Sequence, residues 1–585
     1  MAAVEALIMD HLDLWTAALK RKSTAGRGSS SKVELYGIKK LRELILELAV
    51  RGLLVSQDPN DEPASELLKK IAAEKAKLVK AGTIKKDKLR EPIGEDIPFY
   101  LPTGWTASPL GELAQVIRGV SYQKQDAQDA AFDSSIPLMR ANNINGVLNF
   151  RDLVYVPKAI VRAEQLIVRG DLLIAMSSGS ADLVGKAAQA SQDLDSTFGA
   201  FCAVLRPFTE QLFTFMGFFC KTPFYRNQTQ ATGKGIGIQN LNKTALEMLS
   251  VVVPPLAEQH RIVAKVDELM TLCDQLEQET EASLGAHQTL VETLLNALTS
   301  AADHTQFASA WQRIAGYFDT LFTTEESIDQ LKQTILQLAV MGKLVPQDPN
   351  DEDVQVLLRR NDLRRCEVAE SDRRADVDPQ NILSADDCWE IPASWNWRGL
   401  ADLVLFVDYR GKTPNKQSSG IRLLTAKNVR QGQIDLMPEE FLTEQEYEEW
   451  MTRGLPKVGD VLFTTEAPMG NAAVVELTEQ FALAQRVICF QNYGALDPAF
   501  LVVQILSNQF QYILDKNGTG MTAKGIKASK LKRLPIAIPP LAEQHRIVAK
   551  VDELMAQCDH LKSRLSDAQT TQLHLADALV ERAIC

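Results

Sequence analysis

The sequence predicts an α+β protein with two mixed α/β domains separated by a pair of long antiparallel coiled-coil helices. We expect pseudo-two-fold symmetry and additional N-terminal and central helices. The block PPLAEQHRIVAKVDELM occurs twice, at 254–270 and at 539–555. A second block repeats upstream, LRELILELAVRGLLVSQDPNDE at 41–62 and LKQTILQLAVMGKLVPQDPNDE at 331–352. The stretches between these blocks differ much more, which indicates one duplicated frame that carries two divergent inserts.

Each Pro-Pro pair precedes a predicted helix of about 45 residues, roughly 65 Å long. Apolar residues recur there at steps of three and four, and no proline interrupts 256–345 or 541–585. The apolar seams comprise Val266, Leu269, Cys273 and Leu276 in the first copy and Val551, Leu554, Cys558 and Leu561 in the second. We expect the seams to bury each other in antiparallel pairing. Two helices that pack on separate cores are the alternative.

Shorter amphipathic helices are expected within 31–58 and 321–346, where apolar side chains such as Leu41, Leu44 and Leu48 share one face. Gly52 and Gly342 stand where these helices should end. The DPNDE run that follows each of them predicts a turn.

The inserts consist of short apolar runs broken by Gly, Asn, Pro and Asp, which is typical of strands joined by loops. The predicted organisation is a helical region at 1–95, an insert domain at 96–253, a long helix at 254–300, a central helical region at 301–388 that repeats 31–62, a second insert domain at 389–538 and a second long helix at 539–585.

Charge separates the inserts from the frame. The chain of 585 residues has a net charge of −12. Residues 101–253 contain 13 basic and 12 acidic residues, and residues 391–538 contain 16 and 15. The negative charge therefore belongs to the frame, and only the inserts are suited to approach phosphate.

Composition predicts a cytoplasmic protein. No apolar stretch approaches the ~20 residues that cross a bilayer, and the first residues lack the features of a secretory signal. The eight cysteines form no CxxC pair and have no histidine at zinc-ligand spacing, so we expect reduced thiols and no metal site.

The duplicated PPLAEQHRIVAKVDEL segments and the divergent inserts between them resemble the specificity subunit of type I restriction–modification systems. The resemblance covers nearly the whole chain. The LAVRGLLVSQDPND segment and its partner LAVMGKLVPQDPND are similar to one subgroup of those subunits.

That resemblance implies a sequence-specific DNA-binding protein in which each insert is a target-recognition domain for one half of a bipartite double-stranded DNA sequence. It implies two modification subunits that methylate adenine with S-adenosylmethionine, and two restriction subunits that translocate and cut DNA with ATP and magnesium. It implies no cofactor in this chain. Since the two inserts differ, we expect an asymmetric target, because a symmetric reader favours a palindrome.

Base readout needs Arg, Lys, Asn or Gln at base edges. Three places in each insert combine such residues with loop residues, and the first two resemble positions where the family's domains touch DNA. The candidate DNA contacts of the first insert are Arg118, Tyr122, Gln123, Lys124, Arg140, Asn142, Asn143, Lys234, Gln239, Asn240 and Lys243. Those of the second are Tyr409, Arg410, Lys412, Lys416, Lys427, Asn428, Arg430, Lys524, Lys527, Lys530 and Lys532. Thr425 stands where the first insert has Arg140.

The sequence contains none of the catalytic motifs expected of the partner enzymes, so we expect a chain that is not an enzyme by itself. Gly411-Lys412-Thr413 imitates the end of a phosphate-binding loop, but Phe406 stands where its first glycine is needed. The Asn/Asp-Pro-Pro-aromatic motif of adenine methyltransferases is absent. His260 and His545 have no matched acid or nucleophile and are interpreted as surface or partner-contact residues.

Two other functions remain open from the sequence. The inserts of a non-enzymatic coiled-coil adaptor would bind protein instead of DNA. A self-sufficient enzyme would carry a site that these motifs do not reveal. DNA binding tests the first alternative, and turnover by the purified chain tests the second.

Overall fold

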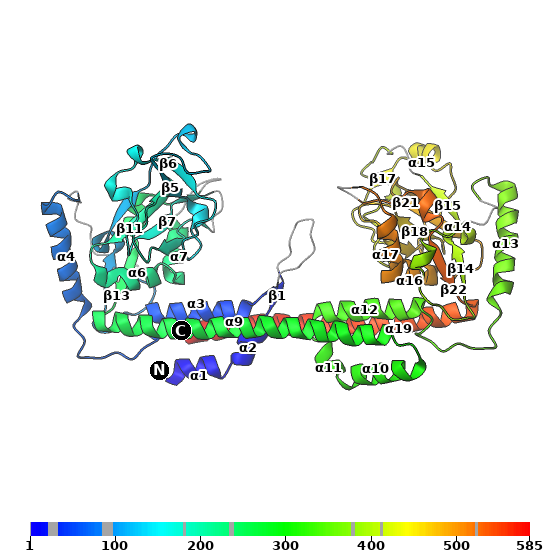
Figure 1. The fold of residues 1–585 in the computed structure, drawn as a ribbon, viewed down its shortest axis with the longest axis horizontal. Coiled ribbons are helices and arrows are strands. Elements are labelled where there is room, and N and C mark those ends of the chain that lie inside the picture. The colour runs from blue at the N-terminus through cyan, green and yellow to red at the C-terminus, as the bar shows by residue number, and fades with distance from the viewer. Residues whose placement is uncertain are drawn as a thin grey trace. The chain divides into compact units, whose positions relative to one another are not determined.

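The computed structural model describes residues 2–21, 33–84, 97–178, 183–232, 239–375, 381–409, 414–520 and 524–584. The chain divides into two compact units (Figure 1). Unit 1 comprises Met1–Ser283 with Ala568–Cys585, and unit 2 comprises Leu284–Asp567. Each unit contains one sheet-bearing domain, the first part of one long helix and the last part of the other.

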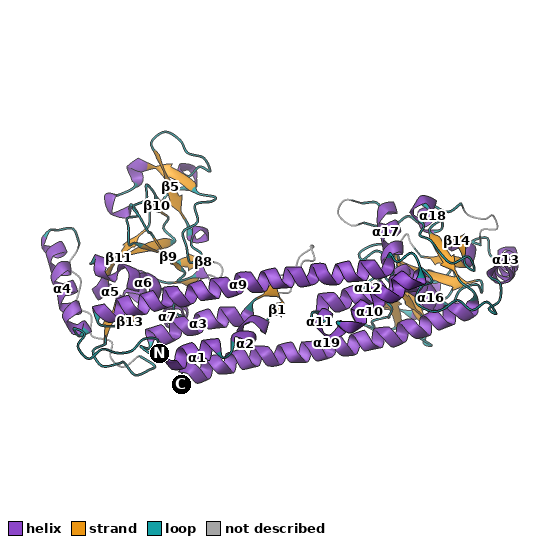
Figure 2. Ribbon diagram, turned by 60° about the horizontal axis from the view of Figure 1, so that its bottom comes forward, coloured by secondary structure: helices purple, strands orange, loops and turns teal. Residues whose placement is uncertain are grey.

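The two long helices are α9, Leu256–Thr299, and α19, Leu541–Ile584, each of 44 residues, which confirms the predicted length. The core of unit 1 joins Val266 and Cys273, near the start of α9, to Ala576, near the end of α19. The core of unit 2 joins Leu295, near the end of α9, to Val551, near the start of α19. The helices therefore run antiparallel within each unit (Figure 2).

The predicted seam residues are buried or half-buried, but the two named sets do not pack against each other. The set of α9 lies in the core of unit 1 against the last part of α19, and the set of α19 lies in the core of unit 2 against the last part of α9. Helix α3, Tyr36–Val50, adds its apolar face to unit 1, and α12, Glu325–Val340, does the same in unit 2. Arg42 of α3 pairs with Asp274 and Glu277 of α9, each at 2.7 Å. Lys562 of α19 pairs with Asp329 of α12 at 2.8 Å. The upstream repeat is therefore part of the helical frame.

Both shorter helices end as predicted. Gly52 and Gly342 have φ of +71° and +68°, a conformation that glycine adopts at little cost. A Cβ at either glycine would lie about 2.5 Å from Pro102 or Pro392. The predicted turn follows, with the backbone N–H of Asn60 donating to Asp58 and that of Asn350 to Asp348.

The domain of unit 1 contains a four-stranded antiparallel sheet and a three-stranded sheet. The first has the order β4-β11-β7-β9, with bounds Ala114–Arg118, Cys202–Pro207, Leu172–Ala175 and Ala187–Gln189. The second has the order β10-β5-β6, with bounds Thr197–Phe198, Ser135–Met139 and Val154–Pro157.

The domain of unit 2 repeats this topology despite its different sequence. Its four-stranded sheet has the order β15-β21-β18-β19, with bounds Val404–Asp408, Val487–Asn492, Val461–Thr464 and Ala472–Val474. Its three-stranded sheet has the order β17-β16-β20, with bounds Phe441–Leu442, Ile421–Leu424 and Phe481–Leu483. In both domains the central strand of this sheet pairs in parallel with one neighbour, β5 with β10 and β16 with β20.

Two further contacts attach each domain to the frame. An antiparallel strand pair enters and leaves the domain, β3 (Thr106–Pro109) with β13 (Ser250–Val253) in unit 1 and β14 (Asn396–Gly399) with β22 (Pro535–Ile538) in unit 2. Helices α4, Ala64–Lys80, and α13, Val354–Ser371, also contact the domains. Lys75 of α4 pairs with Glu112 at 2.9 Å, and Arg365 of α13 pairs with the buried Asp402 at 2.6 Å.

The remaining helices cover the domains and the long helices. They are α1 (Ala2–Met9), α2 (Leu12–Ala17), α5 (Leu110–Leu113), α6 (Phe213–Phe219), α7 (Pro223–Thr232), α8 (Lys243–Glu247), α10 (His304–Gly316), α11 (Phe318–Leu321), α14 (Leu400–Leu403), α15 (Glu444–Trp450), α16 (Pro498–Leu506), α17 (Asn508–Asn517) and α18 (Ala528–Leu531). Among the described residues, no helix has the length and apolar character needed to cross a membrane.

Candidate nucleic-acid interface

A buried carboxylate fixes the first domain to the start of its long helix. Glu258 lies in the first turn of α9 and is 1% exposed. It accepts hydrogen bonds from the indole of Trp105 at 2.9 Å and from the amide of Gln57 at 2.6 Å. Burial raises the pKa of Glu258, and these two hydrogen bonds oppose the rise. Trp105 belongs to the domain and Gln57 to the turn after α3, so three parts of the chain meet at this carboxylate.

The second unit repeats the cluster. Glu543 is equally buried and accepts from Trp395 at 3.1 Å and from Gln347 at 2.5 Å. Beside it Arg546 pairs with Asp351 at 2.6 Å, as Arg261 pairs with Asp61 in unit 1. Both arginines therefore pair with an aspartate of the turn that follows the shorter helix. These contacts explain why Trp, QDPND and PPLAEQHR remain the same in both halves, because together they form the joint.

The first group of predicted DNA contacts follows the first strand of each four-stranded sheet. Arg118 ends β4 and is exposed, as are Gln123 and Lys124, whereas Tyr122 is half-buried. The equivalent strand end in the second domain is Asp408. The charge at this position is therefore reversed between the domains.

Tyr409 is 3% exposed, and the prediction that it contacts DNA is wrong. Its hydroxyl donates to the carbonyl of Gly454 at 2.6 Å and accepts from the backbone N–H of Arg453 at 2.8 Å. The ring therefore anchors the loop after α15. Lys416 is exposed and pairs with Glu440 at 2.7 Å. Arg410 and Lys412 lie outside the described residues.

The second group contains a buried asparagine in each domain. Asn143 and Asn428 are each 1% exposed. The amide of Asn143 donates to the carbonyls of Asn149 and Arg151, both at 2.9 Å, and its oxygen accepts from the backbone N–H of Arg140. Asn428 makes the same kind of bonds inside its own loop. The prediction that these two side chains contact DNA is wrong, because each is buried and donates both amide hydrogens to carbonyls of its own loop.

The exposed members of the second group lie on the loops that these asparagines hold. Asn142 and Lys427 are exposed. Arg430 pairs with Asp435 at 3.4 Å. Arg140 is half-buried, and its guanidinium donates to the carbonyl of Asp152 at 2.9 Å. One edge of that guanidinium is therefore fixed by the loop.

The third group lies next to the loop that leaves β7 in the first domain and β18 in the second. In the first domain β12, Gln239–Asn240, pairs with β8, Ser177–Ser178. The side chains of Gln239 and Asn240, and all of Lys234, lie outside the described part of the chain. Lys243 pairs with Glu247 at 3.5 Å.

In the second domain the same place carries four lysines on and around α18. Lys524 pairs with Asp515 at 2.6 Å, and Lys527 is exposed. Lys530 donates to the carbonyl of Asn517 at 3.1 Å. Lys532 lies 5.8 Å from the ring centre of Phe406. An exposed ion pair contributes about 0–1 kcal/mol, so Lys524 can exchange its carboxylate partner for a phosphate at little cost.

Two cavities of the second domain reveal residues that the sequence did not indicate. One of about 350 Å³ joins Lys527 to Glu466, Gln485 and Arg486. The other, of about 900 Å³, brings Asp408, the strand end beside the first group, and Lys532 from the third group together with Arg373, Arg374 and Arg453. The position of Glu466, two residues after the end of β18, could have indicated the first cavity. Only the packing of α13 reveals the second.

The comparisons with known proteins decide the family. The model of the type I restriction modification DNA specificity domain matches residues 102–286 and 403–568, and so covers more than half of the chain. The chain belongs to the specificity subunits of type I restriction–modification systems.

Two curated relatives match over their full length and over all of this chain. The Escherichia coli EcoAI specificity subunit is 38% identical over 602 residues, and the EcoEI specificity subunit from the same species is 37% identical over 621 residues. Among solved structures, the HsdS subunit of Thermoanaerobacter tengcongensis is 18% identical, with a TM-score of 0.41 over 83% of this chain and 98% of that one.

As a member of this family, the protein is the non-catalytic part of a type I restriction–modification complex that recognises the DNA target. Such subunits assemble with other subunits of the system and with DNA. In the described residues, no three His, Cys, Asp or Glu side chains are placed to hold a metal ion. Burial raises the pKa of Cys202 and Cys220 to about 12, which keeps these thiols protonated at neutral pH.

Proposed function

We propose that the two domains of this specificity subunit read the two halves of an asymmetric bipartite sequence in double-stranded DNA. One observation carries the proposal: the two domains have the same strand order but different side chains at equivalent surface positions. Arg118 of the first corresponds to Asp408 of the second, and Arg140 corresponds to Thr425. Equal scaffolds with unlike surfaces are what two unlike half-sites require.

The long helices are proposed to dock two modification subunits, one on each copy of the duplicated block. The buried residues that are identical in the two copies of the block are explained by their packing in the joint and in the seams. Exposed residues are identical as well, including His260 with His545 and Glu268 with Glu553. The glutamates form exposed ion pairs with Lys265 and Lys550, and His545 lies 3.4 Å from Asp497. Burial in a core does not require these identities, whereas two copies of one partner do. Two restriction subunits complete the proposed assembly.

The cofactors are proposed to belong to the partners. S-adenosylmethionine supplies the methyl group to the modification subunits, and ATP with magnesium drives the restriction subunits. The present chain contributes DNA contacts and the spacing between them.

Binding experiments on the complex with the modification subunits test the proposal. We expect a target duplex to bind about 10³-fold or more tighter than random duplex at physiological salt. Equal affinity for both would support the adaptor alternative instead. The chain alone should not methylate or cut DNA, and turnover above background would contradict its non-catalytic role.

A further inference from the structure

Four cationic side chains gather around one cavity of the second domain. The cavity has a volume of about 900 Å³, and its lining includes Arg373, Arg374, Arg453 and Lys532. Two carboxylates are close, Asp408 in the lining and Asp372 behind Arg374. The site therefore keeps an excess of positive charge on a chain whose net charge is −12.

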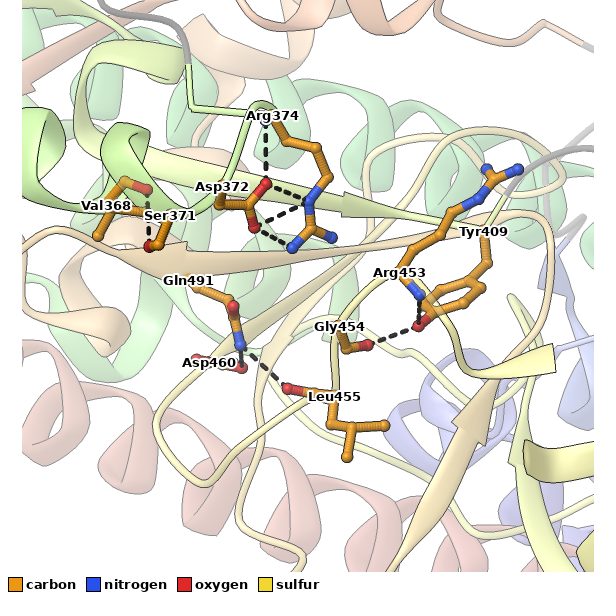
Figure 3. A network of polar contacts seen from close by, with 10 residues as sticks. All are labelled: Val368, Ser371, Asp372, Arg374, Tyr409, Arg453, Gly454, Leu455, Asp460 and Gln491. Carbon is orange, nitrogen blue, oxygen red and sulfur yellow. Dashed lines mark hydrogen bonds and ion pairs between the residues drawn. The ribbon is translucent and has the colours of Figure 1, made fainter. Parts of the chain in front are cut away.

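Arg373 and Arg374 lie in the turn that follows α13 and not in the domain itself. A small core holds this turn in place, formed by Ala375 with Leu405 and Tyr493. The carboxylate of Asp372 accepts from Nε of Arg374 at 2.7 Å and from its backbone N–H at 2.9 Å (Figure 3). The guanidinium of Arg374 is therefore held in one orientation before any ligand arrives, which lowers the entropy lost on binding.

The other two cations are also held by the fold. Nη1 of Arg453 donates to the backbone carbonyl of Asp408 at 2.9 Å, and the backbone N–H of Arg453 donates to the Tyr409 hydroxyl. Figure 3 shows Arg453 beside Tyr409 at the start of the loop that continues through Gly454. Lys532 lies over the ring of Phe406. Strand β15, the loop after α15 and the residue after α18 thus meet the tail of α13 at one place.

The first domain does not repeat this charge. Its strand end is Arg118 instead of Asp408, and the side chain that donates to that strand-end carbonyl is the neutral Gln165, at 3.0 Å. Glu247 takes the place of Lys532 at the end of α8. At the offset of 290 residues that relates α4 to α13, Thr83 and Ile84 correspond to Arg373 and Arg374.

We propose that this basic cavity binds phosphate groups of the DNA backbone beside the half-site of the second domain, and that the first domain lacks the contact. Guanidinium groups match phosphate oxygens in geometry and in charge. Lys532 already belongs to the predicted DNA contacts, so the cavity adjoins the surface proposed for base readout. This inference rests on the proposed function and adds a sequence-independent contact to it.

The test compares wild type with the double variant Arg373→Gln/Lys532→Gln in the complex with the modification subunits. Arg373 is exposed, and neither substitution removes a hydrogen bond that holds the domain together. The matched control is Arg359→Gln, because Arg359 is an exposed cation on α13, the helix that leads to Arg373, but lies outside the cavity. Affinity for target and random duplexes is measured as a function of salt.

We expect the double variant to bind both duplexes about tenfold or more weakly at 0.1 M salt, and to lower the slope of log affinity against log salt by about 1–2. Target duplexes with single neutral methylphosphonate linkages then locate the contact. One linkage should weaken wild type and leave the double variant unaffected, which distinguishes backbone phosphate from free phosphate.

Affinity and salt slope equal to those of Arg359→Gln would overturn the inference. A loss confined to the target duplex would also overturn it, because it would indicate base readout. Failure of the double variant to assemble with the modification subunits would mark the cavity as a protein-docking surface. Wild type that does not discriminate target from random DNA would instead refute the proposed function.

Discussion

The indole N–H of Trp105 donates to the carboxylate of Glu258 over 2.9 Å, across the joint between the first domain and its long helix. Trp395 and Glu543 repeat this relationship over 3.1 Å in the other unit. A buried, hydrogen-bonded carboxylate allows few alternative orientations of the groups that donate to it. Each domain is therefore held in a defined direction relative to the first turns of its helix.

Removal of the joint carboxylate should destabilise its own unit. Glu258→Ala leaves the buried indole N–H of Trp105 and the amide of Gln57 without their acceptor, which costs about 1–3 kcal/mol in free energy of unfolding. Hydrogen exchange should show faster exchange around the joint of unit 1 and unchanged exchange in the domain of unit 2. Glu268→Ala, at an exposed position of the same helix, should change stability by less than about 0.5 kcal/mol. Equal effects of the two variants would contradict the structural role of the cluster.

The same glutamates should make stability depend on pH with a defined sign. Burial raises the pKa of Glu258 and of Glu543, so the folded state holds these protons more tightly than the unfolded chain. Their contribution to stability is full below the ordinary glutamate pKa of about 4.3, and it is lost as pH rises through the raised folded pKa.

Glu258→Gln has no proton to lose, so its free energy of unfolding should increase relative to wild type as pH rises from about 4 to 8. Urea denaturation across this range measures the difference. The prediction would be contradicted if the free energies of unfolding of variant and wild type changed in parallel with pH, or if the variant became less stable than wild type toward neutral pH.

Arg140→Ala should relax recognition at one or two base pairs of the first half-site only. A guanidinium that is bidentate to guanine contributes about 1–3 kcal/mol of discrimination. Binding to a panel of duplexes with single base changes measures it. Thr425 occupies the equivalent position of the second domain, so recognition of the other half-site should be unchanged. An equal loss on target and random DNA would identify Arg140 as a phosphate contact.

Asn143→Ala should act on the fold of its loop and not on base readout. Its amide holds the carbonyls of Asn149 and Arg151, and their loss costs about 1–3 kcal/mol locally. Hydrogen exchange of residues 140–151 should increase. Asn142→Ala, at the exposed neighbouring position, should leave exchange unchanged and alter DNA binding alone. The reverse pattern would restore Asn143 as a direct DNA contact.

The frame could be predicted from the sequence because its repeats combine helical periodicity with an unbroken run of residues. Gly52 and Gly342 marked the helix ends, and the two 44-residue helices followed from the absence of proline. The cover of the seams by α3 and α12 was not predicted, since periodicity identifies an apolar face but not the element that packs against it.

The site was predicted less well, because residue type does not reveal burial in loops. The side-chain amide of an asparagine can bind adenine or can hold a loop closed, and the sequence does not distinguish these roles at Asn143 and Asn428. Tyr409 was grouped with Arg118 because both residue types can contact DNA. The structure shows instead that Asp408, the last residue of β15, is the equivalent of Arg118, the last residue of β4. Arg374 lies 79 residues before Arg453 and reaches the same cavity only because α13 packs on the second domain.

The central claim, that two unlike domains on one repeated frame read two unlike half-sites, is tested most directly by making the domains alike. Residues 96–253 are replaced by a second copy of 389–538, and methylated adenines are mapped in cells that contain the modification subunits. The account predicts that the asymmetric target becomes an inverted repeat of the half-site read by the second domain. A target that stays asymmetric would contradict it.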